Sequence, residues 1–213
     1  MLVRDVMSSN VVTIPSSTSL ADARRIMDAH RIKRLPVMDR GKLVGIVTRD
    51  ALDRAGPSKL TTFSIQEITY LLGKLTVKEA MTTDLVTISP DATVEESVAL
   101  AQSRKVGATL VMEKNRLIGI VTGNDLFYRI MNPILGIGKQ GVRIHIHNCG
   151  DVAKVSEALK VIGDLGLRAI TMFTLPHLDT GEPDFIVHLD TSDPSRVIEE
   201  LTKRGYEVHE RAR

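Results

Sequence analysis

The sequence predicts a mixed α+β protein in which two similar β-α-β-β-α units precede a smaller β-α-β-β-α-β unit. Two observations predict the paired units: apolar residues recur at a constant spacing of 74 residues, and both copies show the same order of patterns. A third observation, a change of pattern after the second copy, predicts the last unit. The expected organisation is residues 1–58 and 76–132 for the two copies, a linker helix at 59–75, a Gly-rich linker at 133–141 and a last domain at 142–213.

The two copies match without a gap over more than forty positions. Met7 recurs as Met81, and the run GIVT that ends at Thr48 recurs as the run that ends at Thr122. A gapless register of this length indicates that the two units arose by duplication.

Each copy begins with a short extended segment, at residues 10–14 and 84–88, which is followed by a turn with Pro and Ser. A helix is expected after Thr18 in the first copy and after Thr93 in the second. A hydroxyl side chain caps the first turn in each case, and apolar residues follow at helical spacing.

Two short apolar runs separated by a tight turn predict a β-hairpin in each copy. A second helix is expected to begin near Asp50 in the first copy and near Asp125 in the second. The four hairpin strands are expected at 34–39 and 43–48, and at 108–113 and 117–122.

The last unit shows strand and helix patterns in the order of the ferredoxin-like fold. Gly166 is expected to end its first helix, and Asp193-Pro194 to begin the second, with Pro194 at the first helical position. The expected strands are 142–147, 168–175, 184–190 and 206–210, and the expected helices are 151–164 and 193–204.

Composition excludes several classes of protein. The chain has 213 residues, 43% of them hydrophobic, and a net charge of +2, which divides into +5 for residues 1–140 and −3 for residues 141–213. Aromatic residues make up 3% and Trp is absent, so a stacking platform for single-stranded nucleic acid is not expected. The single Cys149 and the lack of a long apolar run predict a cytoplasmic protein that does not enter a membrane.

The two copies, each with a PVMD- or LVME-type strand and a GIVT strand followed by an acidic residue, resemble a tandem CBS-domain module, or Bateman module. The intervening segment also resembles the linker of the acetoin-utilisation accessory protein (AcuB-like) family. The resemblance implies a regulatory protein that binds AMP, ADP, ATP or S-adenosylmethionine in clefts between two CBS units. It implies no obligatory cofactor and no enzymatic activity.

The family's binding signature is Thr or Ser, two residues and then Asp, with the Asp reading the ribose hydroxyls. Thr122 and Asp125 match this pattern in the second copy. In the first copy Thr48 is present, but Asp50 comes one position early and Ala51 occupies the Asp position. The resemblance therefore implies one competent site and one weakened site.

A basic run that contains Arg31, Lys33 and Arg34 is expected to contact the phosphates of the nucleotide. The small residues Gly107 and Ala108 at the equivalent place in the second copy are expected to leave room for adenine. The alternative for the basic run is a solvated cluster that complements the carboxyl end of the preceding helix.

Gly136 to Gly141 match the dinucleotide-binding pattern G-x-G-x-x-G, but a helix precedes them and a strand follows. Because that order is the reverse of the dinucleotide-binding one, a flexible interdomain linker is predicted. The domain after it resembles an ACT domain, with Gly150 alone retained from the family's ligand loop. This resemblance implies a homodimer, in which the ACT-like domain pairs the chains or binds a second effector.

Strand alternation places four histidines on the face of the last sheet that the helices do not cover: His145, His147, His188 and His209. Such a cluster could bind a metal ion. The favoured interpretation is a polar face in a dimer interface, and no metal is predicted.

The predicted function is therefore an adenine-nucleotide sensor. A metal-responsive regulator and a DNA-associated regulator are alternatives, although no helix-turn-helix pattern accompanies the basic residues and direct contact with nucleic acid is not expected. An enzyme is disfavoured because Cys149 beside His147 is the only pair of nucleophile and base that the sequence suggests.

Overall fold

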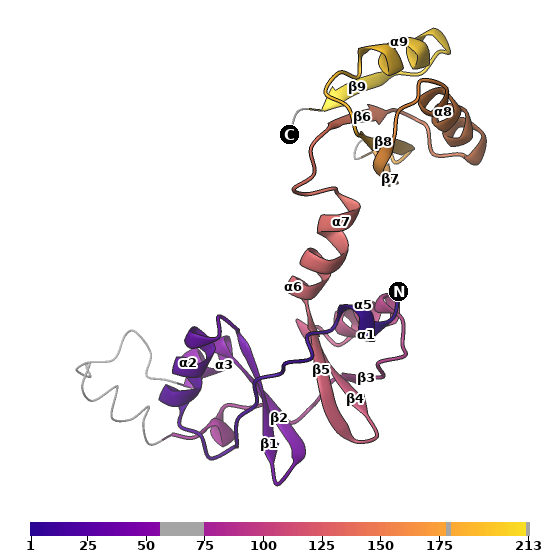
Figure 1. Ribbon diagram of the computed structural model, residues 1–213. Helices are drawn as coiled ribbons and strands as arrows, with labels where there is room; N and C mark the ends of the chain where they lie inside the picture. Colours follow the sequence, from indigo (N-terminus) through magenta and orange to yellow (C-terminus); the bar gives the residue numbers. More distant parts are fainter. Residues whose placement is uncertain (56–74, 178–179, 212–213) are drawn as a thin grey trace. The chain divides into compact units, whose positions relative to one another are not determined.

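The computed structural model describes residues 1–55, 75–177 and 180–211, which form two compact units, Met1–Leu126 and Phe127–Arg213 (Figure 1). The expected linker helix at 59–75 lies outside the described residues, apart from Leu75. Within the described segments, no helix is long and apolar enough to cross a membrane.

The first unit contains five α-helices, one 3-10 helix and five strands among its described residues. In chain order they are α1 (Val3–Val6), α2 (Leu20–Ala29), β1 (Arg34–Asp39), β2 (Lys42–Thr48), α3 (Arg49–Ala55), η1 (Val77–Glu79), β3 (Thr87–Ile88), α5 (Val94–Ser103), β4 (Ala108–Glu113), β5 (Arg116–Thr122) and α6 (Gly123–Leu126).

The second unit begins with a π-helix and continues through the expected order of strands and helices. Its elements are η2 (Phe127–Met131), α7 (Asn132–Ile134), β6 (Val142–Ile146), α8 (Val152–Asp164), β7 (Ala169–Pro176), β8 (Pro183–Leu189), α9 (Ser195–Lys203) and β9 (Val208–Arg211).

Both predicted hairpins are present in the first unit, as the antiparallel pairs β1–β2 and β4–β5. Each pair has a register shift at the same place in the repeat, after Val37 in one copy and after Val111 in the other. The extended segment 84–88 contributes β3, whereas 10–14 contributes only one bridge, from Ile14 to Val37. The strand predicted at 10–14 is therefore shorter than expected.

The helix caps agree with the sequence in one copy and differ by one residue in the other. Thr93 caps α5, and its side chain accepts a hydrogen bond from the Glu96 N–H. In the first copy the cap of α2 is Ser19 and not Thr18, because the Ser19 hydroxyl is the group that accepts from the Asp22 N–H.

The first segment of each copy packs against the other copy. The Val3 N–H donates to the Ala92 carbonyl at 2.9 Å, and the equivalent Val77 N–H donates to the Thr18 carbonyl at 2.8 Å. Val77 is fully buried in the core formed by Leu20, Met27 and other apolar residues of the first copy. Each half of the unit, as it packs, therefore includes the first residues of the other sequence copy.

This exchange continues into two reciprocal bridges, Ser8 to Ile120 on β5 and Thr82 to Ile46 on β2. The methionine beside each bridge lies over a glycine of the partner strand. A Cβ atom added to Gly119 would lie 2.4 Å from Met7 Sδ, and one added to Gly45 would lie 2.6 Å from Met81 Sδ. A side chain at either glycine would require the methionine that lies over it to move.

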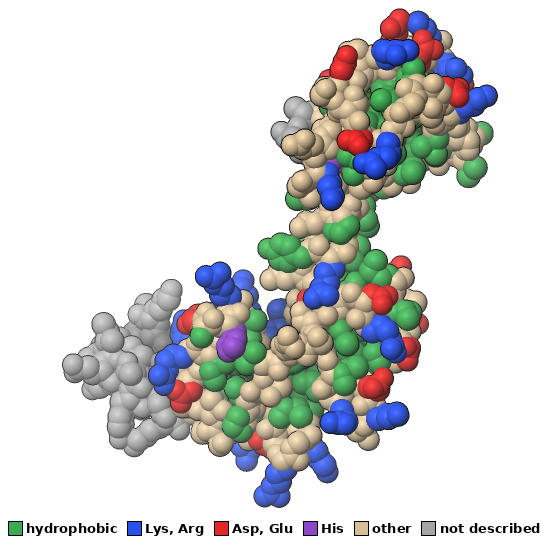
Figure 2. Space-filling model, in the orientation of Figure 1, with side chains coloured by type: hydrophobic (Ala, Val, Ile, Leu, Met, Phe, Trp, Pro, Cys, Tyr) green, Lys and Arg blue, Asp and Glu red, His purple; other side chains and the backbone are tan. Residues whose placement is uncertain are grey.

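The second unit has a four-stranded sheet in the order β7-β8-β6-β9, which is the ferredoxin-like order that the sequence predicts. One face of the sheet contributes Ile144, Ile146 and Val187 to a core with Val161 of α8 and Leu201 of α9. Figure 2 shows acidic and basic side chains interspersed on the visible surface of this unit. Lys203 and Arg204 form ion pairs with glutamates.

Two details of the second unit differ from the prediction. Pro194 is the residue before the first turn of α9 and not its first helical residue. The Gly-rich segment lies against β8: a Cβ atom on Gly136 would meet the His188 ring, and one on Gly141 would meet the Leu189 carbonyl oxygen at 2.1 Å. A helix precedes this segment and β6 follows it, so the order required for a dinucleotide-binding motif is absent from these residues.

We predict that Gly119→Val destabilises the first unit by about 1–3 kcal/mol, because the new side chain overlaps Met7. Valine favours strands, so without the crossing contact the same change would stabilise β5. Urea unfolding followed by far-ultraviolet circular dichroism measures the difference, and Gly123→Ala, whose Cβ would meet nothing within 4 Å, is the control. A Gly119→Val protein as stable as the wild type would contradict the assignment.

Candidate functional site

The first unit contains a cavity of about 580 Å³ whose walls come from both copies of the repeat. Its volume lies within the range typical of small-molecule sites, roughly 300–1,000 Å³. The lining residues are Ser8, Asn10, Val11, Val12, Arg31, Ile32, Lys33, Arg34, Pro36, Gly107, Ile120, Thr122, Gly123, Asn124 and Asp125.

Asp125 forms the acidic part of the wall and is only 9% exposed. Its Oδ2 accepts hydrogen bonds from the Thr122 N–H at 2.8 Å and the Thr122 hydroxyl at 2.6 Å. Its Oδ1 accepts from the Ser8 hydroxyl at 2.7 Å. Ser8 belongs to the first copy and reaches Asp125 through its bridge to Ile120. A prediction from the second copy alone therefore omits Ser8 from the site.

Thr122 and Thr48 occupy equivalent positions at the ends of β5 and β2 but make different hydrogen bonds. In the first copy the Thr48 hydroxyl accepts from the Ala51 N–H at 3.1 Å, as an ordinary helix cap does. In the second copy the residue three positions on is Asp125, whose carboxylate turns the Thr122 hydroxyl into a donor. The difference between Ala51 and Asp125 at this position of the repeat thus changes the threonine hydroxyl from an acceptor to a donor.

Three basic residues of the first copy, Arg31, Lys33 and Arg34, line the same cavity. Within the described part of the chain, no carboxylate lies within ion-pair distance of any of them. Arg49, which follows nearby, instead pairs with Asp28. The cavity therefore holds three cations without partners opposite one buried carboxylate.

Arg31 reaches the cavity from a left-handed backbone conformation, with φ of 54°. The Arg31 N–H donates to the Asp28 carbonyl and the Ile32 N–H to the Met27 carbonyl, so these residues close α2 with a Schellman motif. Glycine is the usual residue at this position. Lys105 closes α5 in the same way, with φ of 52°, but does not line the cavity.

Of the remaining predicted residues, Gly107 lines the cavity. A Cβ atom on Gly107 would lie 2.1 Å from Arg34 Nη2, so the Arg34 side chain lies over this glycine. Ala108, Thr48 and Asp50 do not line the cavity, and Asp50 is exposed.

The family model for the CBS domain matches residues 3–57 and 77–132, more than half of the chain. The chain belongs to the CBS-domain family. The two matched segments are the two copies of the repeat, and the cavity lies between the halves of this CBS pair.

Curated relatives include proteins of very different size. Inosine-5'-monophosphate dehydrogenase of Korarchaeum cryptofilum is 35% identical over 133 residues, which cover 62% of this chain and 25% of the enzyme. A CBS domain-containing protein of Dictyostelium discoideum is 33% identical over 138 residues, 62% of this chain and 95% of that protein. The chain spans a quarter or less of the enzymes it matches first, so their catalytic activities are not transferred.

Two solved structures are similar to the CBS pair. A Vibrio cholerae protein assigned to acetoin utilization (AcuB) is 31% identical, with a TM-score of 0.52, over 62% of this chain and 91% of that one. The CBS domain pair of protein MJ0100 is 28% identical, with a TM-score of 0.51, over 62% of this chain and 96% of that one. The latter was solved in complex with 5'-methylthioadenosine and S-adenosyl-L-methionine.

Cys149 of the second unit is fully buried in the apolar core. Burial, with a smaller contribution from the Asp151 carboxylate, raises the pKa of the thiol to about 11. The thiol is therefore protonated at neutral pH, and its pairing with His147 as nucleophile and base has no support in the geometry.

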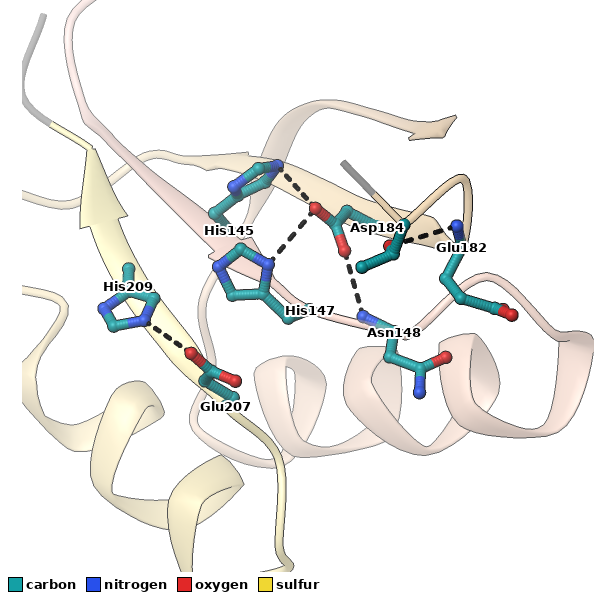
Figure 3. Close-up of polar contacts among 8 residues, drawn as sticks. His145, His147, Asn148, Glu182, Asp184, Glu207 and His209 are labelled. Atoms are coloured by element: carbon teal, nitrogen blue, oxygen red, sulfur yellow. Dashed lines mark hydrogen bonds and ion pairs between the residues drawn. The ribbon is translucent and has the colours of Figure 1, made fainter. Parts of the chain in front are cut away.

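Three of the four predicted histidines gather on the uncovered face of the second sheet: His145, His147 and His209 (Figure 3). His188 lies on that face next to Gly136, but it belongs to neither group of ligand atoms that gathers there among the described residues. Sequence reasoning missed Asp184, although it precedes Ile186 and His188 at the strand period of two.

We predict that Arg31→Gly and Lys105→Gly each stabilise the first unit by about 0.5–1 kcal/mol. Glycine removes the left-handed strain of about 1–2 kcal/mol, and the extra flexibility of the unfolded chain offsets part of that gain. Urea unfolding by circular dichroism measures both. A loss of stability in either variant would mean that its side chain makes contacts that outweigh the strain.

Proposed function

We propose that the CBS pair is a regulatory sensor whose cavity binds an adenine nucleotide, AMP, ADP or ATP. The observation that carries this proposal is the convergence of three unpaired cations from one CBS copy with Thr122 and Asp125 from the other. The adenosyl complexes of the similar MJ0100 pair support the ligand class.

Charge favours a phosphate-bearing ligand over S-adenosylmethionine. Arg31, Lys33 and Arg34 face the cavity without carboxylate partners, and an arginine can bind two phosphate oxygens at once. S-adenosylmethionine has a net charge of about +1 at neutral pH, because its sulfonium and ammonium groups outweigh its one carboxylate, so these cations attract it less than they attract a phosphate ester. Phosphates are therefore assigned to the basic wall, and the ribose to the opposite wall.

Asp125 is suited to bind a ribose hydroxyl. A carboxylate offers about four acceptor positions, of which Thr122 and Ser8 fill three. The fourth accepts from the ribose, and rotation of the Ser8 hydroxyl toward the ligand would release another. The aliphatic side chains of Val11, Val12 and Ile120 provide an apolar surface for the adenine ring.

A ligand that touches both CBS copies favours one arrangement of the two copies over others, and this bias is the regulatory signal. The size of the signal is limited by the difference in the ligand's affinity for the two arrangements. We place this sensor in the cytoplasm, in keeping with a single buried, unpaired cysteine.

The second unit is assigned to an ACT-like role as a dimerisation domain. Its ferredoxin-like sheet ends at β7, an edge strand of eight residues on which Met172 and Leu175 are about half exposed. An edge strand presents unpaired backbone N–H and C=O groups with which a strand of another chain can pair. We propose that two β7 strands pair across a homodimer axis.

Thermal melts followed by circular dichroism, together with titration calorimetry, test the nucleotide site. We expect millimolar AMP, ADP or ATP to raise the melting temperature more than S-adenosylmethionine does. Asp125→Asn keeps the shape of the side chain but removes its charge and should weaken binding roughly ten- to a hundredfold. The matched control is Asp50→Asn, which changes an exposed residue outside the cavity.

The glycine variants provide a second comparison for the same site. Arg31→Gly should weaken nucleotide binding, whereas Lys105→Gly relieves the same backbone strain and should leave affinity unchanged. The proposal fails if none of the four ligands binds, or if Asp50→Asn and Lys105→Gly weaken binding as much as the cavity variants.

Sedimentation equilibrium tests the dimer. The double variant Met172→Lys and Leu175→Lys places like charges on both sides of the proposed axis and should shift the chain to monomer. Val152→Lys adds a charge at an apolar residue that is 83% exposed elsewhere in the unit, and should leave the dimer intact. A monomeric wild type, or equal dissociation of both proteins, would refute pairing through β7.

A further inference from the structure

The face of the second sheet that α8 and α9 do not cover carries a compact group of side chains unrelated to the nucleotide cavity. His145 and His147 project from the β6 segment toward the Asp184 carboxylate of β8 (Figure 3). The side chain of Asp184 is 3% exposed, and those of both histidines are 17% exposed. We call these three residues the His-His-Asp group.

The distances within the group match those between ligands around one small ion. Asp184 Oδ2 lies 3.2 Å from His147 Nδ1 and 3.7 Å from His145 Nε2. Ligand bonds of about 2.0–2.1 Å in tetrahedral geometry place neighbouring ligand atoms about 3.3–3.4 Å apart. Both distances to Asp184 Oδ2 are close to this value, and the ligand atoms of all three residues lie within 4.8 Å of one another.

The group is held in place before any ion binds. The backbone N–H of Asn148 donates to Asp184 Oδ1 at 2.9 Å, which orients the carboxylate and leaves Oδ2 directed at the histidines. Oδ2 is buried and has no hydrogen-bond partner among the residues that the structure describes. His145 Nδ1 is also buried and without a hydrogen-bond partner among the described residues. Buried polar atoms in natural proteins nearly always have partners, and an ion would supply one for Oδ2.

A second set of side chains adjoins the group but is less well formed. His209 and Glu207 on the β9 side lie close enough to His147 to share an ion with it. Their side chains are 54% and 71% exposed, however, and they form a hydrogen bond of 3.1 Å with each other. Ordering two exposed side chains costs entropy, so the buried group is the better primary site.

We propose that the His-His-Asp group binds one divalent transition-metal ion of the zinc, cobalt or nickel class. Two imidazoles and one carboxylate suit these metals, whereas calcium and magnesium require sets of oxygen ligands. The three protein ligands leave one coordination position open, and a water molecule fills it. His209, whose ring centroid lies 5.2 Å from that of His147, is an exposed residue beside the group that could replace the water.

Titration calorimetry with Zn²⁺, on full-length protein freed of any affinity tag and treated with a chelator, tests this site. We expect one ion per chain. Asp184→Asn preserves the size of the side chain and should weaken zinc binding at least tenfold. His30→Gln, which removes an exposed histidine of the first unit, should leave binding unchanged. Circular dichroism of each variant checks that the second unit remains folded.

Visible spectra of the Co²⁺-loaded protein provide a readout that does not depend on affinity. Intense absorption bands are expected for four-coordinate cobalt in the wild type and in His209→Gln, and weak or absent bands in His147→Gln. The proposal is overturned if no stoichiometric ion binds, if Asp184→Asn binds zinc like the wild type, or if His30→Gln loses as much affinity as Asp184→Asn. Loss of the bands in His209→Gln alone would move the site to the exposed set and would also overturn it.

Discussion

The first unit depends on a reciprocal crossing of two backbone segments. Met7 lies over Gly119 and Met81 lies over Gly45, at distances that leave no room for a side chain on either glycine. Because each crossing segment pairs with the sheet of the other copy, neither copy completes its core alone. The cavity exists because the crossing holds the basic segment of one copy opposite β5 and α6 of the other.

Duplication produced equivalent positions, and later substitutions made them unequal. Asp125 and Ala51 occupy the same place in the repeat, as do Arg34 and Ala108. Asp125 is present in one copy, and Lys33 and Arg34 in the other, and all three line a single cavity. This division is the physical basis for expecting one strong site in a nearly symmetric CBS pair.

The second unit uses the strand period of two to separate packing from polar chemistry. Ile144 and Ile146 enter the core beneath the helices, while His145 and His147 face the opposite side. A sheet with α8 and α9 on one face can thus keep a stable core and still place ionisable groups on the other face. Burial lowers the pKa of His145, although the Asp184 carboxylate opposes this shift. For Asp184, burial alone would raise the pKa, but the Asn148 N–H and the two histidines outweigh it and lower the pKa.

The sequence by itself determined the repeat, the order of strands and helices along the chain and the Thr122–Asp125 pattern, because periodicity and duplication can be recognised along the chain. Only the tertiary structure decided that Ser8 contacts Asp125, that Arg34 fills the space over Gly107, and that Asp184 rather than His188 joins His145 and His147. Each of these contacts joins residues at least 36 positions apart in the chain, apart from the neighbouring His145 and His147. Such pairs form through strand register and exchanged packing, which no local pattern specifies.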